Sequence, residues 1–209
     1  MSQKKHDLIA VAKETEDIVS KGMLPIDNTV FNIKNDIEFS ISYAKYFGEF
    51  FKIEDDFVEN KKINIKVFND KAGNVGKELL KLDRDVLVLN FASAKHPGGA
   101  WLNGAKAQEE DLCRCSSLFS SLITQNSYYV NNINCGTSLY TDDIIYSPMV
   151  PFFREDDTMQ LCDMFKMSVI TSPAPNVNNL SEDEEFENLE DVIYNRAMKI
   201  FSVANKQGH

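Results

Sequence analysis

The sequence predicts an α/β fold, and three observations carry this prediction. Segments with a period-two pattern of apolar residues alternate along the chain with segments of helical period. Residues 86–91, VLVLNF, form a continuous apolar run, which is typical of a strand buried on both faces of a sheet. A loop containing glycines and then a helical pattern follow that run directly. At 209 residues the chain has the size of one domain, so we expect a single domain over residues 1–209.

The N-terminal part, about residues 1–60, is predicted to be mainly helical. A first helix ends near Gly22 and Pro25, and its apolar side carries Leu8, Ile9, Ala12, Thr15 and Val19 at steps of one, three or four residues. A short strand is expected at residues 29–33. A second helix is expected over residues 36–47, with Asn35 as its N-terminal cap.

The middle of the chain continues the alternation. The pattern predicts a half-buried strand in residues 62–69, a helix over residues 75–82, the buried strand at residues 86–91 and a helix over residues 108–123. The inner side of this last helix is predicted to carry Leu112, Cys115, Phe119 and Leu122.

Two more strands and a long helix complete the predicted fold. The strands lie at residues 144–146 and 167–171, and each runs into prolines, which we take as strand ends. Ser181 and Glu184 fit a capping box for the last helix, and the acidic run there is interpreted as its solvated start.

Composition limits the classes of partner. The net charge is -10 and the isoelectric point is about 4.8, so a general electrostatic interaction with nucleic-acid phosphates is disfavoured. The apolar stretch near the N-terminus is too short for a signal peptide or a membrane span. We therefore expect an intracellular protein, in the cytoplasm with the nucleus as an alternative, that binds neither membrane nor nucleic acid directly.

Neither a metal nor a cofactor is expected. The four cysteines, at positions 113, 115, 135 and 162, form no CxxC pair, and the three histidines show no ligand spacing with them. The cysteines are therefore interpreted as free thiols.

Residues 96–111, HPGGAWLNGAKAQEED, contain the candidate site. The loop follows the carboxyl end of the predicted central strand, where ligands bind in α/β sheets. Gly98 and Gly99 allow main-chain amides to approach an anion such as a phosphate or diphosphate. The spacing matches neither a dinucleotide fingerprint nor a P-loop, so a nucleoside triphosphate is not indicated.

The acidic pair after the loop suggests a sugar. One carboxylate can hold ribose hydroxyls, while the other, with its pKa raised by burial and by its negative neighbour, can protonate a leaving glycosidic oxygen. Adjacent helical positions point about 100° apart, so Glu109 and Glu110 are expected to divide these roles on one face of a substrate. An ordinary first turn of a helix, stabilised by the helix dipole, explains Gln108, Glu109 and Glu110 equally well from spacing alone.

A resemblance adds to this interpretation. Residues 88–118, VLNFASAKHPGGAWLNGAKAQEEDLCRCSSL, resemble the signature of microbial-type poly(ADP-ribose) glycohydrolases, in which three glycines precede Gln-Glu-Glu by six to eight residues. Further similarity runs through residues 11–22, 140–154 and 168–176. The resemblance implies a macrodomain-like three-layer α/β/α sandwich with a mixed sheet.

The resemblance also implies roles for individual residues. Glu110 is the expected catalytic acid at the ribose–ribose glycosidic bond, and Glu109 is expected to hold the adjacent ribose hydroxyls. The implied ligand is ADP-ribose or poly(ADP-ribose), with no metal. Further residues expected to contact it are Gln108, the loop residues Gly98, Gly99 and Ala100, and the strand-end residues Asn90, Ala92 and Ser93.

Two departures from the family pattern bear on activity. Ala100 stands where a third glycine is expected, and similar proteins continue beyond the segment that ends here at His209, into another strand and a glycine-rich loop. We therefore expect a C-terminal part of the family fold to be missing and a partner chain to be a candidate for completing it. The alternatives to a glycohydrolase are a catalytically weak or inactive ADP-ribose-binding module and a structural α/β protein.

Overall fold

The computed structural model describes residues 3–53, 63–180 and 187–209. Helices and strands alternate along these residues. In chain order they are α1 (Gln3–Lys21), β1 (Met23–Ile26), β2 (Thr29–Asn32), α2 (Lys34–Ser42), β3 (Lys45–Phe47), α3 (Ala72–Leu80), β4 (Leu87–Ala92), the 3-10 helix η1 (Trp101–Asn103), α4 (Gln108–Cys115), α5 (Leu118–Leu122), α6 (Asn126–Asn134), β5 (Ile144–Arg154), β6 (Leu161–Pro173), the 3-10 helix η2 (Val177–Asn179) and α8 (Leu189–Gln207).

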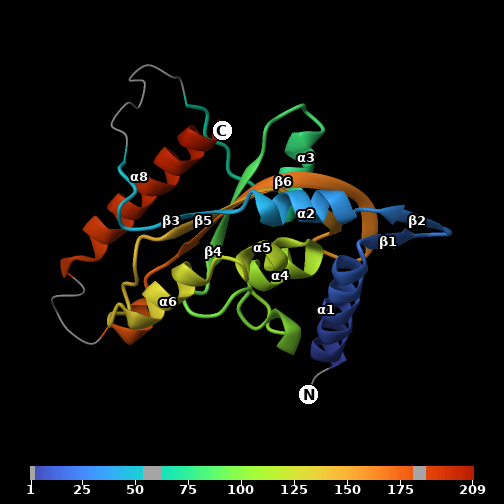
Figure 1. Cartoon of the computed structure of the whole chain (residues 1–209), viewed down its shortest axis with the longest axis horizontal. Coiled ribbons are helices and arrows are strands. Elements are labelled where there is room, and N and C mark those ends of the chain that lie inside the picture. Colours follow the sequence, from blue (N-terminus) through green and yellow to red (C-terminus); the bar gives the residue numbers. More distant parts are fainter. Residues whose placement is uncertain (1–2, 54–62, 181–186) are drawn as a thin grey trace.

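A mixed sheet forms the middle layer of the molecule. Its four strands lie in the order β3-β5-β6-β4, with β4 parallel to β6 and the other pairs antiparallel. The short hairpin of β1 and β2 stands apart from this sheet. Helices cover both faces of the sheet, so the α/β class and the three-layer arrangement are confirmed (Figure 1).

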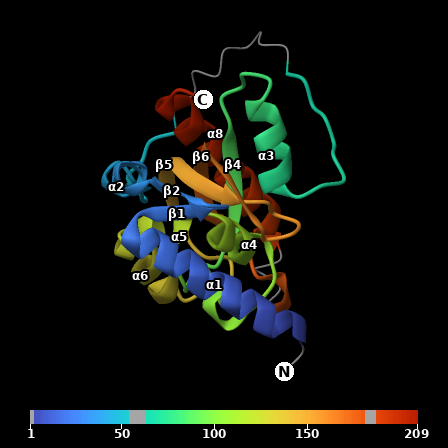
Figure 2. The same cartoon turned by 90° about the vertical axis from the view of Figure 1, so that its right-hand side faces the viewer.

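Each face of the sheet has its own apolar cluster. On one face α1, α4, α5 and α6 pack against β4 to β6 around residues such as Val88, Leu112, Leu122, Tyr128 and Phe152. On the other face Val203 and its neighbours in α8 pack against Ile144, Tyr146 and Ile170. Figure 2 shows α1 lying outside α4 on the first face.

The first helix is confirmed as α1, and the strand predicted at residues 29–33 is confirmed as β2. The second helix, α2, is shorter than predicted. It starts at Lys34, so Asn35 lies inside it, and Asn32 Oδ1 instead accepts a hydrogen bond from the Lys34 amide, at 3.0 Å. The helix ends at Ser42, and Lys45–Phe47 pair with β5 as strand β3. Residues 45–47 form a strand and not the end of a helix because they pair with β5, a long-range contact that local helix propensity does not predict.

The strand predicted in residues 62–69 is wrong for the described part, residues 63–69. These residues belong to no strand, and Ile63, Ile65 and Val67 are between 81% and 93% exposed. Alternating apolar residues become a strand only beside a neighbouring strand, and none of the described strands lies beside this segment. The next prediction is confirmed, since α3 covers most of the predicted helix.

The single helix predicted over residues 108–123 is broken into α4 and α5. Ser116 adopts an extended conformation, with φ -150° and ψ -179°, and forms a bridge with Phe152 of β5. The Ser117 amide donates to the carbonyl of Pro151, at 3.0 Å. The helix is therefore interrupted at Ser116 and Ser117, which bind the main chain of β5. The apolar face predicted for one helix is divided between α4 and α5.

The strands near residues 144 and 167 are confirmed but extend much further than predicted. Pro148 and Pro151 lie inside β5, next to an irregularity between Ser147 and Val150, so these prolines do not mark its end. Pro173 does end β6.

The buried strand is confirmed as β4, but it is not buried on both faces. It lies at the end of the strand order, and Phe91 is 61% exposed. The last helix is confirmed as α8, whereas the predicted capping box at Ser181 and Glu184 lies outside the described residues.

Candidate functional site

The loop between β4 and α4 depends on two glycines. Gly98 and Gly99 have φ values of +66° and +59°, in the left-handed region that side chains disfavour. A methyl group at Gly98 would lie 2.9 Å from Trp101 Cδ1, and one at Gly99 would collide with the Glu110 carboxylate. These positions need glycine both for their conformation and for the close approach of α4.

Position 100 does not require a glycine. Its φ of -114° is ordinary for an L-residue. The left-handed backbone conformation, which would cost an alanine about 1–2 kcal/mol, does not occur at position 100.

Glu109 is buried beneath this loop. It is 3% exposed, and its two carboxylate oxygens accept hydrogen bonds from the Ser93 amide at 2.7 Å and from the Gly98 amide at 3.2 Å. Burial raises its pKa to about 7; the Ser93 amide and the Asn90 carboxamide oppose the shift, and the charge of Glu110 adds to it. Burial therefore favours the protonated form of Glu109 relative to an ordinary glutamate.

Glu110 lies nearer to solvent. It is half-buried, and its Oε1 accepts a hydrogen bond from the Ala100 amide, at 3.2 Å. The two glutamates thus hold two different amides of one loop. The two neighbouring carboxylates therefore have different surroundings, and the division of roles between them stays a prediction.

The loop amides predicted to meet a diphosphate are all hydrogen-bonded within the protein. Gly98 donates to Glu109 and Ala100 donates to Glu110, while the Gly99 amide donates to the carbonyl of His96, at 2.9 Å. An anion at these amides must therefore replace carboxylate partners. The sequence alone did not predict that the carboxylates of α4 bind the loop amides, because these contacts join separate segments of the chain.

The three strand-end residues lie together at the carboxyl end of β4. Asn90 is buried and donates to Thr171 Oγ1 of β6, at 3.2 Å, while its own Oδ1 has no partner among the described residues. Ala92 is buried, and the Ser93 hydroxyl accepts from the amides of Lys95 and His96. The Asn90 carboxamide and the Ser93 amide both border Glu109.

Gln108 is placed differently from the other predicted residues. Its Oε1 accepts from the Phe91 amide at 2.8 Å, and its Nε2 donates to the carbonyl of Leu89 at 3.0 Å. Both ends of its carboxamide thus bind the main chain of β4. In this structure Gln108 ties the start of α4 to the strand.

A cavity of about 430 Å³ opens next to the loop. It lies beyond the carboxyl ends of the parallel strands β4 and β6, the usual ligand position in such sheets. Besides Ser93 and its neighbours, it is lined by Lys95, His96, Tyr140 and residues 174–176. Lys95 Nζ lies 5.7 Å from the ring centroid of Tyr140. Tyr140 and Asn176 reach the cavity from distant segments; both lie in stretches that resemble the family, but neither was predicted as a site residue.

The arrangement can combine acid chemistry with anion binding. Two carboxyl groups face one loop, a lysine and a histidine stand at the adjacent cavity, and main-chain amides lie between them. In the described residues, no group of three or more His, Cys, Asp or Glu side chains could hold a metal ion. None of the helices in that part of the chain has the length and apolar character needed to cross a membrane.

Comparisons with known proteins identify the family of the chain. Residues 12–155 match the model of the family described as microbial-type poly(ADP-ribose) glycohydrolase, catalytic domain. No curated protein matches the chain.

Solved structures also match the chain. The poly(ADP-ribose) glycohydrolase of Thermomonospora curvata, bound to the inhibitor ADP-HPD, is 31% identical with a TM-score of 0.85, over 98% of this chain and 76% of that one. The enzyme of Deinococcus radiodurans in complex with ADP-ribose is 40% identical with a TM-score of 0.63, over 66% of this chain and 57% of that one. The chain described here therefore belongs to the microbial-type poly(ADP-ribose) glycohydrolase family.

Proposed function

We propose that the protein hydrolyses the ribose–ribose O-glycosidic bond of poly(ADP-ribose). The observation that carries this proposal is that Glu109 and Glu110 both contact the glycine loop, one buried and one half-exposed, beside a cavity at the ends of β4 and β6. Family membership and the ADP-ribose complex of the D. radiodurans relative support the choice of ligand. An ordinary first helical turn would not require both carboxylates to bind loop amides.

Glu110 is the proposed general acid. It is half-buried and only one of its oxygens has a hydrogen-bond partner among the described residues, so the other can reach a leaving oxygen. Glu110 protonates the departing ribose oxygen, positive charge develops on the other ribose, and a water activated by the resulting carboxylate completes hydrolysis.

Glu109 is proposed to bind rather than to transfer a proton. Both of its oxygens are already held by main-chain amides, which fixes their direction for accepting ribose hydroxyls. Its raised pKa would also suit an acid, so the two assignments need separate variants.

The diphosphate is proposed to lie at the loop of Gly98, Gly99 and Ala100, with the strand end of Asn90, Ala92 and Ser93 along the adjoining ribose. Lys95 lines the cavity next to this loop, and its positive charge favours a negative group there. Gln108 takes part indirectly, through its bonds to β4.

Hydrolysis of purified poly(ADP-ribose) tests the assignment. Glu110→Gln should lower the rate by about 10²- to 10⁴-fold, the usual contribution of a general acid, with ADP-ribose binding retained. Glu109→Gln should chiefly weaken binding. If Glu110→Gln stays active while Glu109→Gln loses turnover, the acid is Glu109. Binding by the wild type without any release of ADP-ribose would support the alternative, an ADP-ribose-binding module.

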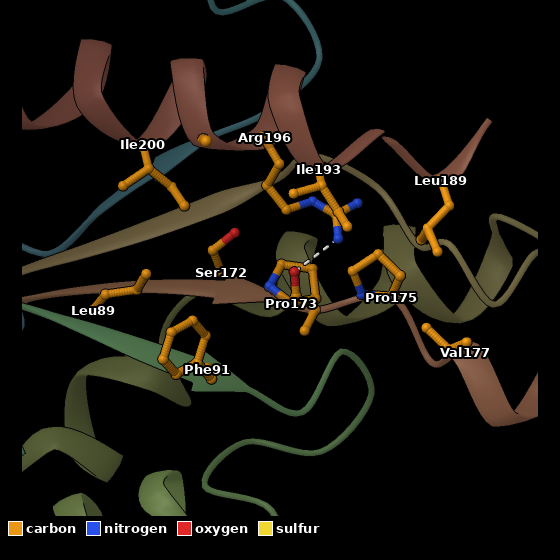
Figure 3. A pocket seen from close by; sticks show the side chains of 12 residues that line it. Leu89, Phe91, Ser172, Pro173, Pro175, Val177, Leu189, Ile193, Arg196 and Ile200 are labelled. Atoms are coloured by element: carbon orange, nitrogen blue, oxygen red, sulfur yellow. Dashed lines mark hydrogen bonds between the residues drawn. The ribbon is translucent and has the colours of Figure 1, made fainter. Parts of the chain in front are cut away.

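The surface beside β4, at the end of the strand order, supports a further proposal: a second polypeptide segment binds at this edge of the sheet. Alternate residues of a strand direct their peptide groups to opposite edges, and Gln108 reaches Leu89 and Phe91 from the edge that faces away from β6. Next to this edge, Leu89 and Phe91 line an apolar groove of about 370 Å³ beneath α8 (Figure 3).

We propose that this edge accepts an extended segment with apolar residues at every second position. The strand would pair with β4 and place its apolar side in the groove against Ile193 and Ile200 of α8. The probe is the part of the T. curvata enzyme that lies outside the match. Added in excess, it should slow hydrogen exchange of the Leu87 and Leu89 amides. Unchanged exchange, or dimerisation of the chain alone through this edge, contradicts the proposal.

A further inference from the structure

We propose that Arg114 is a positioning residue that anchors the glycine loop to α4 independently of the two glutamates. The inference rests on the proposed function, because it concerns the same loop and the same reaction. It assigns to Arg114 no contact with the substrate.

The Arg114 guanidinium binds both ends of the second half of the loop. Nη1 donates to the carbonyl of Trp101 at 3.1 Å, and Nη2 donates to the carbonyl of Ala105 at 2.7 Å. The residue is fully buried. Between the two carbonyls lie the 3-10 helix η1 and Gly104, whose φ is +72°. One rigid planar group therefore fixes the start and the end of this turn.

The guanidinium is itself held in place by charge. Nη2 also donates to Asp111 Oδ1 at 2.6 Å, and the other oxygen of Asp111 accepts from Lys71 Nζ at 3.2 Å. Lys71 in turn pairs with Asp156 at 3.1 Å, beyond the end of β5. These side chains connect α4, the start of α3 and the connection from β5 to β6. Arg114 therefore does not depend on the loop for its own orientation.

The anchor matters because the first half of the loop is held by the catalytic pair. Glu109 and Glu110 bind the Gly98 and Ala100 amides, and these bonds must exchange when a substrate takes the amides or the carboxylates. The bonds from Arg114 use loop carbonyls, which a diphosphate does not compete for. The loop can therefore exchange partners at Gly98 and Ala100 while it stays fixed at Trp101 and Ala105.

Arg114→Lys is the test, with Arg154→Lys as its matched control. Lysine keeps the charge beside Asp111 but cannot reach two separated carbonyls as a fork does. Arg154 is also buried, and it also binds a carboxylate and a carbonyl, those of Glu14 and Met159. Its Nε reaches the main chain of Arg114 through the Thr15 hydroxyl, but it makes no hydrogen bond to the loop. Trp101 is the only tryptophan of the chain, so its fluorescence reports the loop directly.

We expect Arg114→Lys to lower kcat/KM by about 10²-fold, the loss that a misplacement of about 1 Å produces, mainly through KM. In the absence of substrate it should shift Trp101 emission to the red and raise its quenching by acrylamide. Both variants should lower the melting temperature by similar amounts. Arg154→Lys, however, should leave the Trp101 emission and KM unchanged. Equal effects of both variants on KM, or unchanged Trp101 emission in Arg114→Lys, would overturn the proposal.

Hydrogen exchange on the wild type covers the case in which Arg114→Lys does not fold. The Asn103, Gly104 and Ala105 amides bond within the loop, to the carbonyls of Ala100 and Trp101. They should stay protected when ADP-ribose is added, while protection of the Gly98 and Ala100 amides changes. Loss of protection at Asn103 to Ala105 on binding contradicts an anchor. Absence of ADP-ribose binding would count against the proposed function instead, and the Trp101 readout without substrate would still decide the role of Arg114.

Discussion

Glu109 and Glu110 are neighbours in the sequence but meet different surroundings. The first is enclosed by the loop and the end of β4, and the second reaches towards solvent. Adjacent helical positions necessarily point in different directions, so a single turn of α4 places one carboxyl in the protein interior and one at its surface. The acidic pair therefore offers two different environments to the two proposed roles.

Glu109 should make the stability of the protein depend on pH. A carboxyl whose pKa is raised on folding binds its proton more tightly in the folded state, so stability falls as pH rises from 4.5, the ordinary value, to about 7. This group should lower the free energy of unfolding by on the order of 3 kcal/mol across that window. Urea unfolding at a series of pH values measures it. Glu109→Gln should lack this component, and parallel pH profiles of the two proteins would contradict the prediction.

Substitution should have a large effect at Gly99 and a small effect at Ala100. Gly99→Ala places a methyl group against the Glu110 carboxylate at a φ of +59°, and the conformation alone costs about 1–2 kcal/mol. We expect a lower melting temperature and a loss of hydrolysis. Ala100→Gly is the control, and it should change hydrolysis little, because residue 100 has an ordinary φ. A more active Ala100→Gly variant would show that this position limits the loop.

At the scale of elements, sequence patterns located most helices and strands but not their ends. The apolar spacing around Leu112 and Leu122 predicted one helix because both residues do face the same core. The break at Ser116 depends on pairing with Phe152, which is far away in the sequence. In the same way, the alternation at Ile63 and Ile65 is present but no described strand pairs with it. Local periodicity reports burial, whereas strand pairing is decided by distant segments.

The junction of α4 and α5 should depend on one hydroxyl. Ser116 Oγ donates to the carbonyl of Leu112 at 2.7 Å and accepts from the Leu118 amide at 3.1 Å, so it serves the end of one helix and the start of the next. Ser116→Ala should lower the free energy of unfolding by about 1–2 kcal/mol, measured by urea unfolding. The half-buried Ser120 lies one turn further on and serves as the control. A similar loss in Ser120→Ala would mean that the hydroxyl at position 116 has no special role.

At the scale of the whole molecule, the resemblance predicted the layers and the mixed sheet, and the structure brings several of the predicted site residues together. Glu109, Glu110, Ser93, Gly98 and Ala100 form one hydrogen-bonded group. The sequence did not predict that the carboxylates occupy the loop amides, nor that Tyr140 reaches the adjacent cavity. Both depend on the path of the chain between segments, which spacing within one segment does not contain.

The apolar clusters that pack on the two faces share the same sheet, so they should unfold together. β4, β5 and β6 contribute to the cluster that contains Trp101, and β4 also borders the cluster under α8. For the proposed single domain of residues 1–209, we expect one transition, with the same midpoint by Trp101 fluorescence and by far-ultraviolet circular dichroism. Two separate midpoints would indicate that α8 and its cluster form an independent unit.

The carboxamide of Gln108 gives the edge of the sheet a connection to the reaction. It holds Leu89 and Phe91 on one side, and it begins the helix that carries both glutamates on the other. A strand that pairs with those two peptide groups must release Gln108, which frees the first turn of α4. For the proposed strand and the proposed sugar ligand, thermodynamic linkage then means that occupancy of each site changes the affinity of the other by the same factor.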